Sequence, residues 1–254
     1  MNSDSRFQSR ACRCRTAAAA LALVIFAGTA ALAQNVEPGF RGLFNGKDLT
    51  GWAGRTNHWS VQDGAITGVT TTNNPARGNN FLIAQQDGTN LVVADFELRL
   101  SFKFTGDFGN SGVQYRSKDM GNFVVHGYQG DMENGTNYTG ILYEEGGRGI
   151  LALRGQAVVL KEDPEKPGKT KIEIIGGEGS AAAIQAAIRQ GDWNDYVVVA
   201  RGNHLQHFVN GKKAVDVRDE QSAKAAKSGI LALQIHQGPP MKVQFRDIRI
   251  RVLE

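Results

Sequence analysis

Polar side chains capable of binding or acid–base chemistry alternate with small or apolar residues on several strand-like stretches. In LALQIH, Gln234 and His236 point one way, while Leu231, Leu233 and Ile235 form the apolar face. A fixed amide can hold a hydroxyl in a set direction, and an imidazole can exchange a proton near neutral pH. One such stretch is more typical of an ordinary solvated face, with His236 as a hydrogen-bonded edge histidine, whereas the same bias on several strands favours a shared polar groove.

Other stretches show the same bias. SGVQYR places Gln114 and Arg116 on one face, and GYQGDME places Gln129 and Asp131 on one face. Further polar candidates are Tyr143, Glu144, Arg148 and Gln206. Amides, a guanidinium and carboxylates on neighbouring strands suit a polyhydroxylated ligand. The alternative is a set of ordinary solvated faces, with Arg116 paired to Asp131 and Arg148 capping a loop.

Several well-defined catalytic motifs are missing from the sequence. It contains no Gly-x-Ser-x-Gly elbow, no phosphate-binding loop, no dinucleotide fingerprint and no His-Glu-x-x-His helix. His204 and His207 have an odd spacing, which puts the two rings on opposite faces of a strand and argues against a metal pair. The sequence therefore predicts neither a metal nor a cofactor, and it disfavours serine hydrolases, kinases, dinucleotide-dependent enzymes and zinc proteases.

The N-terminal segment has the pattern of an export signal. The basic stretch MNSDSRFQSRACRCR precedes the apolar stretch TAAAALALVIFAGTAALA, which ends in Ala31-Leu32-Ala33. This pattern predicts a signal peptide over residues 1–33, cleavage before Gln34, and export to the periplasm or the medium. The alternative is an uncleaved membrane anchor, whereas a cleaved chain is expected to have no stable membrane insertion.

Removal of residues 1–33 changes what the composition implies. The full chain has 29 basic and 25 acidic residues, for a net charge of +4. The segment contains four of the basic residues and one acidic residue, so the remainder has a net charge of +1. Cys12 and Cys14, the two cysteines, leave with it. The mature chain is expected to have no disulfide, and its charge gives no electrostatic reason to bind nucleic acid.

Period-two alternation runs through most of the remaining chain. In FELRLSFKF, the apolar residues from Phe96 to Phe104 share one face, as in a half-buried strand. Asn210-Gly211 predicts a type I′ hairpin turn, and a bulge near Arg246-Asp247 would restore the register of the last strand. Only Ser180–Gln190 has a helical pattern, with Ser180 as N-cap. The sequence predicts an all-β fold, in which residues 34–254 form one two-sheet antiparallel β-sandwich with one short helix.

Five blocks of sequence, in this order, resemble a known family. They are RGLFNGKDLTGW, WSVQDGAITG, DFELRLSFKF with GNSGVQYRS, GDWNDYVVVARGNHLQHFVNG and GILALQIHQGPPMKVQFRDIRI. Together they resemble the 3-keto-disaccharide hydrolase domain, long known as domain of unknown function 1080, from about Arg41 to Val252. The resemblance implies a concanavalin-like jelly roll with one concave, polar sheet, and a small saccharide as substrate.

The resemblance also implies chemistry on a glycoside that is already oxidised at C3. A base removes the acidified C2 hydrogen, the C1 leaving group departs, and water can then add back. Carried onto this sequence, it implies Arg116 over the C3 oxygen, His236 or Asp131 as the base, and Glu144 as the acid. The implied substrate-binding residues are Gln114, Gln129, Tyr143, Arg148, Gln206 and Gln234.

Other functions fit the same scaffold. Laminarinase-type glucanases carry Glu-x-Asp-x-Glu on a concave strand, but the nearest stretch here begins with Gln129, and an amide cannot act as the nucleophile. A non-catalytic glycan-binding module would use the same polar face without turnover. A structural envelope protein would neither bind nor cleave a saccharide, and a metal-dependent activity would be lost on chelation.

Overall fold

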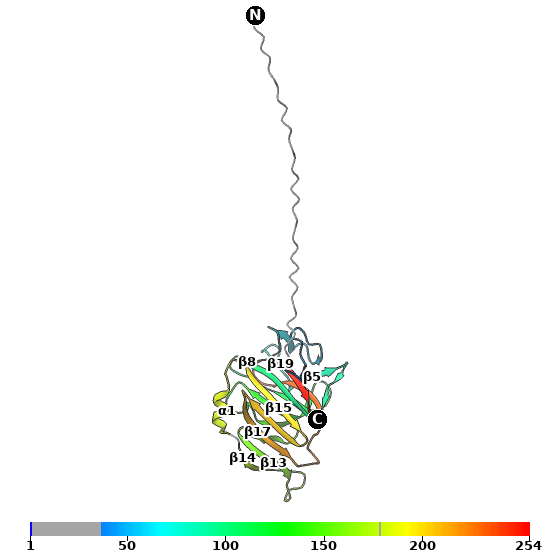
Figure 1. Ribbon diagram of the computed structural model, residues 1–254, viewed down its shortest axis with the longest axis vertical. Helices are drawn as coiled ribbons and strands as arrows, with labels where there is room; N and C mark the ends of the chain where they lie inside the picture. Colours follow the sequence, from blue (N-terminus) through cyan, green and yellow to red (C-terminus); the bar gives the residue numbers. More distant parts are fainter. Residues whose placement is uncertain (2–36, 178) are drawn as a thin grey trace. The chain divides into compact units, whose positions relative to one another are not determined.

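Two β-sheets account for most of the folded chain. The computed structural model describes Met1, residues 37–177 and residues 179–254. The predicted signal peptide and its cleavage site fall, apart from Met1, outside the described residues. Figure 1 shows the strands of the folded chain as arrows. Hydrophobic side chains from both sheets form one shared core between them. The prediction of a largely antiparallel, two-sheet jelly-roll sandwich with one short helix is confirmed.

The first sheet contains ten of the strands found in residues 37–177 and 179–254. They are β1 (Arg41–Gly42), β3 (Trp59–Gln62), β4 (Ala65–Val69), β8 (Phe96–Thr105), β13 (Gln156–Glu162), β14 (Thr170–Gly176), β15 (Asn194–Arg201), β16 (His204–Val209), β17 (Lys212–Asp219) and β19 (Lys242–Val252). Their order is β14-β13-β17-β16-β15-β8-β19-β4-β3, with β1 beside β19. Strands β13 and β17 run parallel, which departs from the otherwise antiparallel pattern of this sheet.

The second sheet contains nine strands over the same described ranges. They are β2 (Trp52–Ala53), β5 (Asn80–Gln86), β6 (Thr89–Asn90), β7 (Val92–Val93), β9 (Asn110–Asp119), β10 (Val125–Glu133), β11 (Leu142–Glu145), β12 (Gly149–Ala152) and β18 (Gly229–Ile235). The main order is β12-β11-β10-β9-β18-β5-β2, so the last long strand but one, β18, lies between β9 and β5.

The local features predicted from turn and bulge chemistry are present. Asn210 and Gly211 have φ values of 46° and 76°, as a type I′ turn requires. The register of β19 against β8 shifts between Arg246 and Arg249, and Asp247 has a φ of 54°. This bulge lets both halves of β19 turn their apolar residues to the core.

The helix is shorter than the sequence pattern predicts. Helix α1 (Ala181–Ala187) begins after Ser180, whose side chain accepts a hydrogen bond from the Ala183 amide at 3.0 Å. It ends before the predicted Gln190 because Ile188 adopts an extended backbone and the Arg189 amide donates to the Asn194 side chain instead. Over the described ranges, no helix has the length and apolar character needed to cross a membrane.

A buried imidazole links the two sheets inside the core. His207, on β16, lies between the hydroxyls of Tyr115 on β9 and Tyr196 on β15, with ring nitrogens 2.9 and 3.1 Å from them. Burial lowers the pKa of His207 to about 4, although the backbone of Ile141 and Gly140 partly offsets this effect. The ring is therefore neutral in the folded protein at neutral pH.

This lowered pKa makes the fold sensitive to acid. Between about pH 6.5 and 4 the unfolded chain protonates His207 and the folded chain does not, so stability falls as pH falls through this window. A His207→Asn variant cannot titrate there, and it should lose up to about 3 kcal/mol less than the wild type over that range. Urea unfolding at several pH values measures the difference. Parallel pH profiles for the two proteins would contradict the assignment.

Candidate functional site

The face of the nine-stranded sheet that points away from the core carries the candidate site. Gln129 on β10 pairs with Gln114 on β9 and with Tyr143 on β11, so the three side chains share this face. Alternation along the same strands brings Asp131 and Glu145 to the same side. Five polar residues from three adjacent strands therefore share one face of the sheet.

Hydrogen bonds connect these side chains in a row that ends at two carboxylates. The amide of Gln114 donates to Gln129 at 2.7 Å, and the amide of Gln129 donates to Asp131 Oδ1 at 2.5 Å. Gln129 also approaches Gln234 Oε1 at 3.5 Å, and Gln234 donates to Glu145 at 2.9 Å. We call Gln114, Gln129 and Gln234 the amide row. Gln129 donates to Asp131 and Gln234 donates to Glu145, while Gln114 holds Gln129, so the row keeps both carboxylates in place.

Close packing fixes the position of the amide row. Gly112 lies opposite Asp131 on β9, and a Cβ atom at this position would lie 2.6 Å from Gln129 Cγ. Only glycine therefore leaves room for Gln129 to cross the strand. On the same face of the sheet, Phe81, Ile83 and Ala232 belong to a small apolar cluster, and the pairing of Gln234 with Phe81 places it beside the row.

Asp131 lines a pocket of about 210 Å³. The pocket is lined by Asn79, Asn110, Gln129, Asp131, Tyr138, Ile141, Tyr143, Glu145, Ile150 and His236. Among the described residues, only Gln129 donates a side-chain hydrogen bond to Asp131, and it does so at Oδ1. Oδ2 is left for a ligand in the pocket.

The environment of Asp131 changes its acid–base chemistry. The pKa of Asp131 is raised to about 8, first by burial and then by the carboxylates of Glu145 and Glu133, while the Gln129 hydrogen bond acts in the opposite direction. The group is therefore mostly a neutral carboxylic acid at pH 7. An acid of this kind can donate a proton to a leaving oxygen.

Glu145 is a site residue that the sequence analysis missed. It lines the pocket of Asp131, and it accepts two hydrogen bonds from Asn79 at 3.1 Å and one from Gln234. The alternation in LYEE contains the signal, because Tyr143 and Glu145 must share a face. Glu144, the acid that the family resemblance implies, points to the other side of the strand.

Glu144 and Arg148 are engaged elsewhere, which corrects their predicted roles as acid and substrate-binding residue. Arg148 donates to Glu144 at 2.7 Å and to Asp219 at 2.6 Å, and all three side chains are largely buried. Burial by itself would lower the pKa of Arg148, but its hydrogen bonds to Glu144 and Asp219 raise it above the ordinary value. Tyr128 also donates to Asp219, at 2.5 Å. These groups form a hydrogen-bonded network in the wall of a cavity of about 680 Å³, which Arg116, Glu144 and Arg148 line together away from Asp131.

Arg116 does not lie beside Asp131, which corrects its predicted role over the C3 oxygen. Strand β9 has one extra residue relative to both β10 and β18 at this point, and Arg116 has a φ of 47°. The bulge breaks the alternation that Gln114 would otherwise continue.

The Arg116 guanidinium is instead buried, and each of its three nitrogens donates at least one hydrogen bond. It donates to Asp95 at 2.8 Å, to the carbonyl of Ala94 at 2.7 Å and to that of Gly202 at 2.6 Å. Its side chain has no exposed area. Burial lowers the pKa of Arg116, and Asp95 partly offsets this. Gly202 lies between β15 and β16, so Arg116 connects β9 to the ten-stranded sheet.

The predicted substrate-binding glutamines fall into three environments. Gln129 lines the pocket of Asp131. Gln114 and Gln234 are completely buried, so they support the pocket without facing it. Gln206 lies on β16 in the other sheet and donates to Asp216 at 2.7 Å, which places it outside the site and corrects that prediction. Its alternation resembles that of the site strands, but the pattern does not say which sheet a strand joins.

His236 and Tyr143 are brought to the pocket of Asp131, as the face assignments require. The Nδ1 atom of His236 lies 2.5 Å from the carbonyl oxygen of Gln237. A carbonyl can only accept, so Nδ1 carries the hydrogen and Nε2 of the neutral ring is an acceptor. Tyr143 is half-buried. Its pKa is raised mainly by burial and to a smaller extent by the charges of Glu145 and Asp131, so the hydroxyl stays protonated.

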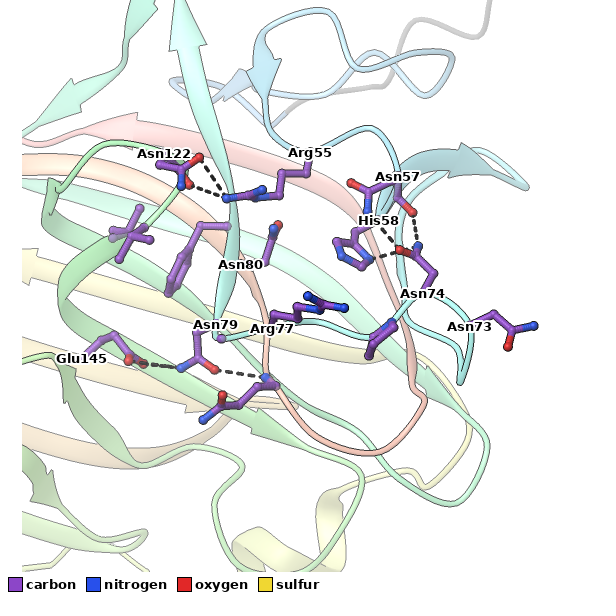
Figure 2. A pocket seen from close by; sticks show the side chains of 16 residues that line it. Arg55, Asn57, His58, Asn73, Asn74, Arg77, Asn79, Asn80, Asn122 and Glu145 are labelled. Carbon is purple, nitrogen blue, oxygen red and sulfur yellow. Dashed lines mark hydrogen bonds between the residues drawn. The ribbon is translucent and has the colours of Figure 1, made fainter.

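A larger cavity of about 630 Å³ adjoins this pocket, and Figure 2 shows its side chains. It is lined by Arg55, Asn57, His58, Asn73, Asn74, Pro75, Arg77, Gly78, Asn79, Asn80, Phe81, Asn122, Val124, Val125, Glu145 and Gln237. We call it the asparagine cavity. Asn79 and Glu145 line both spaces, so their hydrogen bonds mark the boundary between the two.

The described part of the chain contains no group of three His, Cys, Asp or Glu side chains placed to hold a metal ion. His204 and His207 point to different environments, because His204 pairs with Asp216 and His207 lies in the core between two tyrosines.

Comparison with solved structures places the fold among known sandwiches. Two proposed glycosyl hydrolases from Parabacteroides distasonis ATCC 8503 match with TM-scores of 0.53 and 0.54 and sequence identities of 20% and 19%. The matches cover 85% and 84% of this chain, and 94% and 99% of those chains. A Bacillus subtilis protein of unknown function with a galectin-like fold matches with a TM-score of 0.51 at 11% identity, over 80% of this chain and 90% of that one. At these identities the likeness shows the fold alone.

Comparison with family models is more specific. No curated protein matches the chain. The family model of the 3-keto-alpha-glucoside-1,2-lyase-like domain matches residues 39–251, which is nearly all of the described sandwich. The match supports the resemblance seen in the sequence motifs and indicates a carbohydrate-active protein. The chain belongs to the family of 3-keto-alpha-glucoside-1,2-lyase-like domains.

Proposed function

We propose that this chain cleaves the glycosidic bond of 3-keto-glycosides by elimination in the pocket of Asp131. The observation that carries the proposal is a buried carboxyl, raised in pKa, whose Oδ2 is left for a ligand in a pocket that His236 also lines. Family membership supports a saccharide ligand. A keto group at C3 makes the hydrogen at C2 acidic, so a base and an acid on this face can catalyse elimination.

The chemistry follows from the carbonyl at C3. A base removes the hydrogen at C2, and the electron pair of that bond forms an enolate with the C3 oxygen. The enolate then collapses to a C1=C2 double bond as the oxygen at C1 leaves with a proton from an acid. Water can add across this double bond, which gives net hydrolysis. The site must therefore supply a base, an acid and a donor to the developing C3 oxygen.

His236 is the base in this proposal and Asp131 is the acid. Nε2 of His236 is free to accept the C2 hydrogen because Nδ1 is held by the Gln237 carbonyl. Asp131 holds a proton at pH 7, which the leaving oxygen can take. Tyr143 replaces Arg116 as the donor to the C3 oxygen, since its hydroxyl stays protonated beside Glu145 and Asp131. Gln129 holds Asp131 in position from the pocket wall.

Leaving-group dependence separates the two proton-transfer roles. Asp131→Asn should lower kcat/KM about 10²- to 10⁴-fold on a 3-keto-glycoside with a poor leaving group, and much less on the 4-nitrophenyl analogue, which needs no acid. His236→Gln should lower both by similar factors, because both substrates need C2 proton removal. Product release followed by mass spectrometry measures the rates. Equal losses for both substrates in Asp131→Asn would show that Asp131 is not the acid.

The same measurements test the alternative of a glycan-binding module. A module that only binds would raise its melting temperature with a 3-keto-glycoside and release no product. Cleavage by the wild type that survives unchanged in both variants would remove this pocket as the site.

The raised pKa of Asp131 also predicts an effect on stability. Between about pH 4 and 8 the folded chain keeps the Asp131 proton and the unfolded chain does not, so stability falls as pH rises through this window. Asp131→Asn cannot titrate, so it should gain on the order of 5 kcal/mol relative to the wild type between pH 4 and 8. Urea unfolding at fixed pH steps gives the comparison. A constant difference between the two proteins across this range would contradict the raised pKa.

We also propose that the chain is exported. The proposal rests on the basic and apolar stretches of residues 1–33 and on the pattern Ala31-Leu32-Ala33. Expression in a Gram-negative host should give a periplasmic product whose intact mass corresponds to a chain that begins at Gln34. Recovery of the uncleaved chain from the cytoplasm would contradict export.

A further inference from the structure

The asparagine cavity differs in charge from the pocket of Asp131 that it adjoins. Two guanidinium groups line it, those of Arg55 and Arg77 (Figure 2). Its one carboxylate is Glu145, which lies at the shared boundary and accepts three hydrogen bonds from Asn79 and Gln234. The cavity away from that boundary is therefore positively charged.

Both arginines have N–H donors that form no hydrogen bond with the described residues. Arg77 is exposed, and it makes no hydrogen bond or ion pair with the described residues. Arg55 uses only Nη2, which donates to the side chain of Asn122 at 2.9 Å and to its backbone carbonyl at 3.2 Å. Nε and Nη1 of Arg55 are left unbonded by the described residues. Within the described ranges, Asn122 alone holds the Arg55 guanidinium. The remaining N–H groups of Arg55 can therefore donate to a ligand in the cavity.

A buried amide supports the same conclusion. Asn80 is 5% exposed, and its Oδ1 accepts a hydrogen bond from the Trp59 indole at 3.0 Å. Its Nδ2 has no partner among the described residues, although the side chain lines the cavity. This nitrogen is not among the buried unpartnered atoms of the described residues, so it reaches the cavity and can donate to water or to a ligand. Asn80 therefore adds a fixed donor to the wall of the cavity.

From these contacts we infer that the asparagine cavity binds an oxyanionic group, a carboxylate or a sulfate, on the sugar unit that adjoins the cleaved bond. A guanidinium fork matches the two oxygens of such a group, and an amide donor can serve a third oxygen or a hydroxyl. Two guanidinium groups disfavour a cationic ligand or a metal ion. The inference rests on the proposed function in one respect, which is that it takes the pocket of Asp131 as the place of cleavage.

Binding of unoxidised sugars tests the inference without any cleavage. The probes are methyl β-glucuronide, methyl β-glucoside and the 6-sulfate of methyl β-glucoside, titrated calorimetrically into the mature protein. The wild type should bind at least one of the two anions about tenfold or more tightly than the neutral glucoside, because hydrogen bonds to charged groups are strong. Raising the salt concentration should narrow the difference. The tighter of the two anions identifies the source of the oxyanion.

Variants assign the preference to the cavity. Arg77→Gln and Arg55→Gln should each reduce the ratio of anion to glucoside affinity about tenfold. Arg218→Gln is the matched control, since Arg218 is exposed on β17 in the other sheet and loses the same charge. Its ratio should equal that of the wild type. Melting temperatures check that each variant is folded.

Two results would overturn the inference. One is equal affinity of the wild type for both anions and the glucoside, and the other is an anion preference that survives in Arg55→Gln and Arg77→Gln. Failure of the proposed function looks different, because there the anion preference would persist while no 3-keto-glycoside is cleaved. Cleavage that proceeds without any anion preference would remove only the inference about the cavity.

Discussion

The hydrogen bond from Gln129 to Asp131 is the contact on which the site depends. It holds a carboxyl group in a place that water hardly reaches, and it leaves the second oxygen for the pocket. A buried amide must satisfy its own oxygen as well, and Gln114 does so for Gln129. Gln234 in turn donates a hydrogen bond to the carboxylate of Glu145. Removal of one member of this row would leave its neighbour with an unpaired buried group, so the row acts as a unit.

The buried arginines show why charge alone is a poor guide to a site. The strand patterns predicted Arg116 and Arg148 on the candidate face. In the structure, ion pairs and hydrogen bonds within the fold hold both side chains. A guanidinium removed from water needs partners for most of its donors, and Arg116 finds a carboxylate and backbone carbonyls while Arg148 finds two carboxylates. Arg55 and Arg77, which keep open donors in the asparagine cavity, lie in loops that the alternation of the strands does not mark.

Much of the fold could be predicted from the sequence, because alternation, turn chemistry and the family motifs are local properties. The strand at Phe96–Thr105, the Asn210-Gly211 turn and the bulge at Asp247 follow from residue types over a few positions. The site was predictable only where strands run unbroken. One left-handed residue, Arg116, rotates its own side chain off the face, and nothing in SGVQYR announces this conformation.

The other errors have different causes. Gln206 was misplaced because alternation gives a face but not a sheet, and strand order is set by contacts between distant segments. Glu145 was missed although its position relative to Tyr143 determines its direction. Asn79 and most of the residues that line the asparagine cavity were missed because they lie in loops, which have no alternation to interpret.

Close packing at Gly130 limits how far the pocket wall can move when a ligand binds. Its neighbours on β10 are Gln129 and Asp131, and a Cβ atom there would lie 2.8 Å from the Tyr196 hydroxyl of the opposite sheet. Strand β10, which carries Asp131, therefore packs against the core on one face and is held by the hydrogen bonds of the amide row on the other. A preorganised wall of this kind loses little conformational entropy when a sugar arrives. Discrimination among sugars should then arise from the match of hydroxyl positions, with little contribution from induced fit.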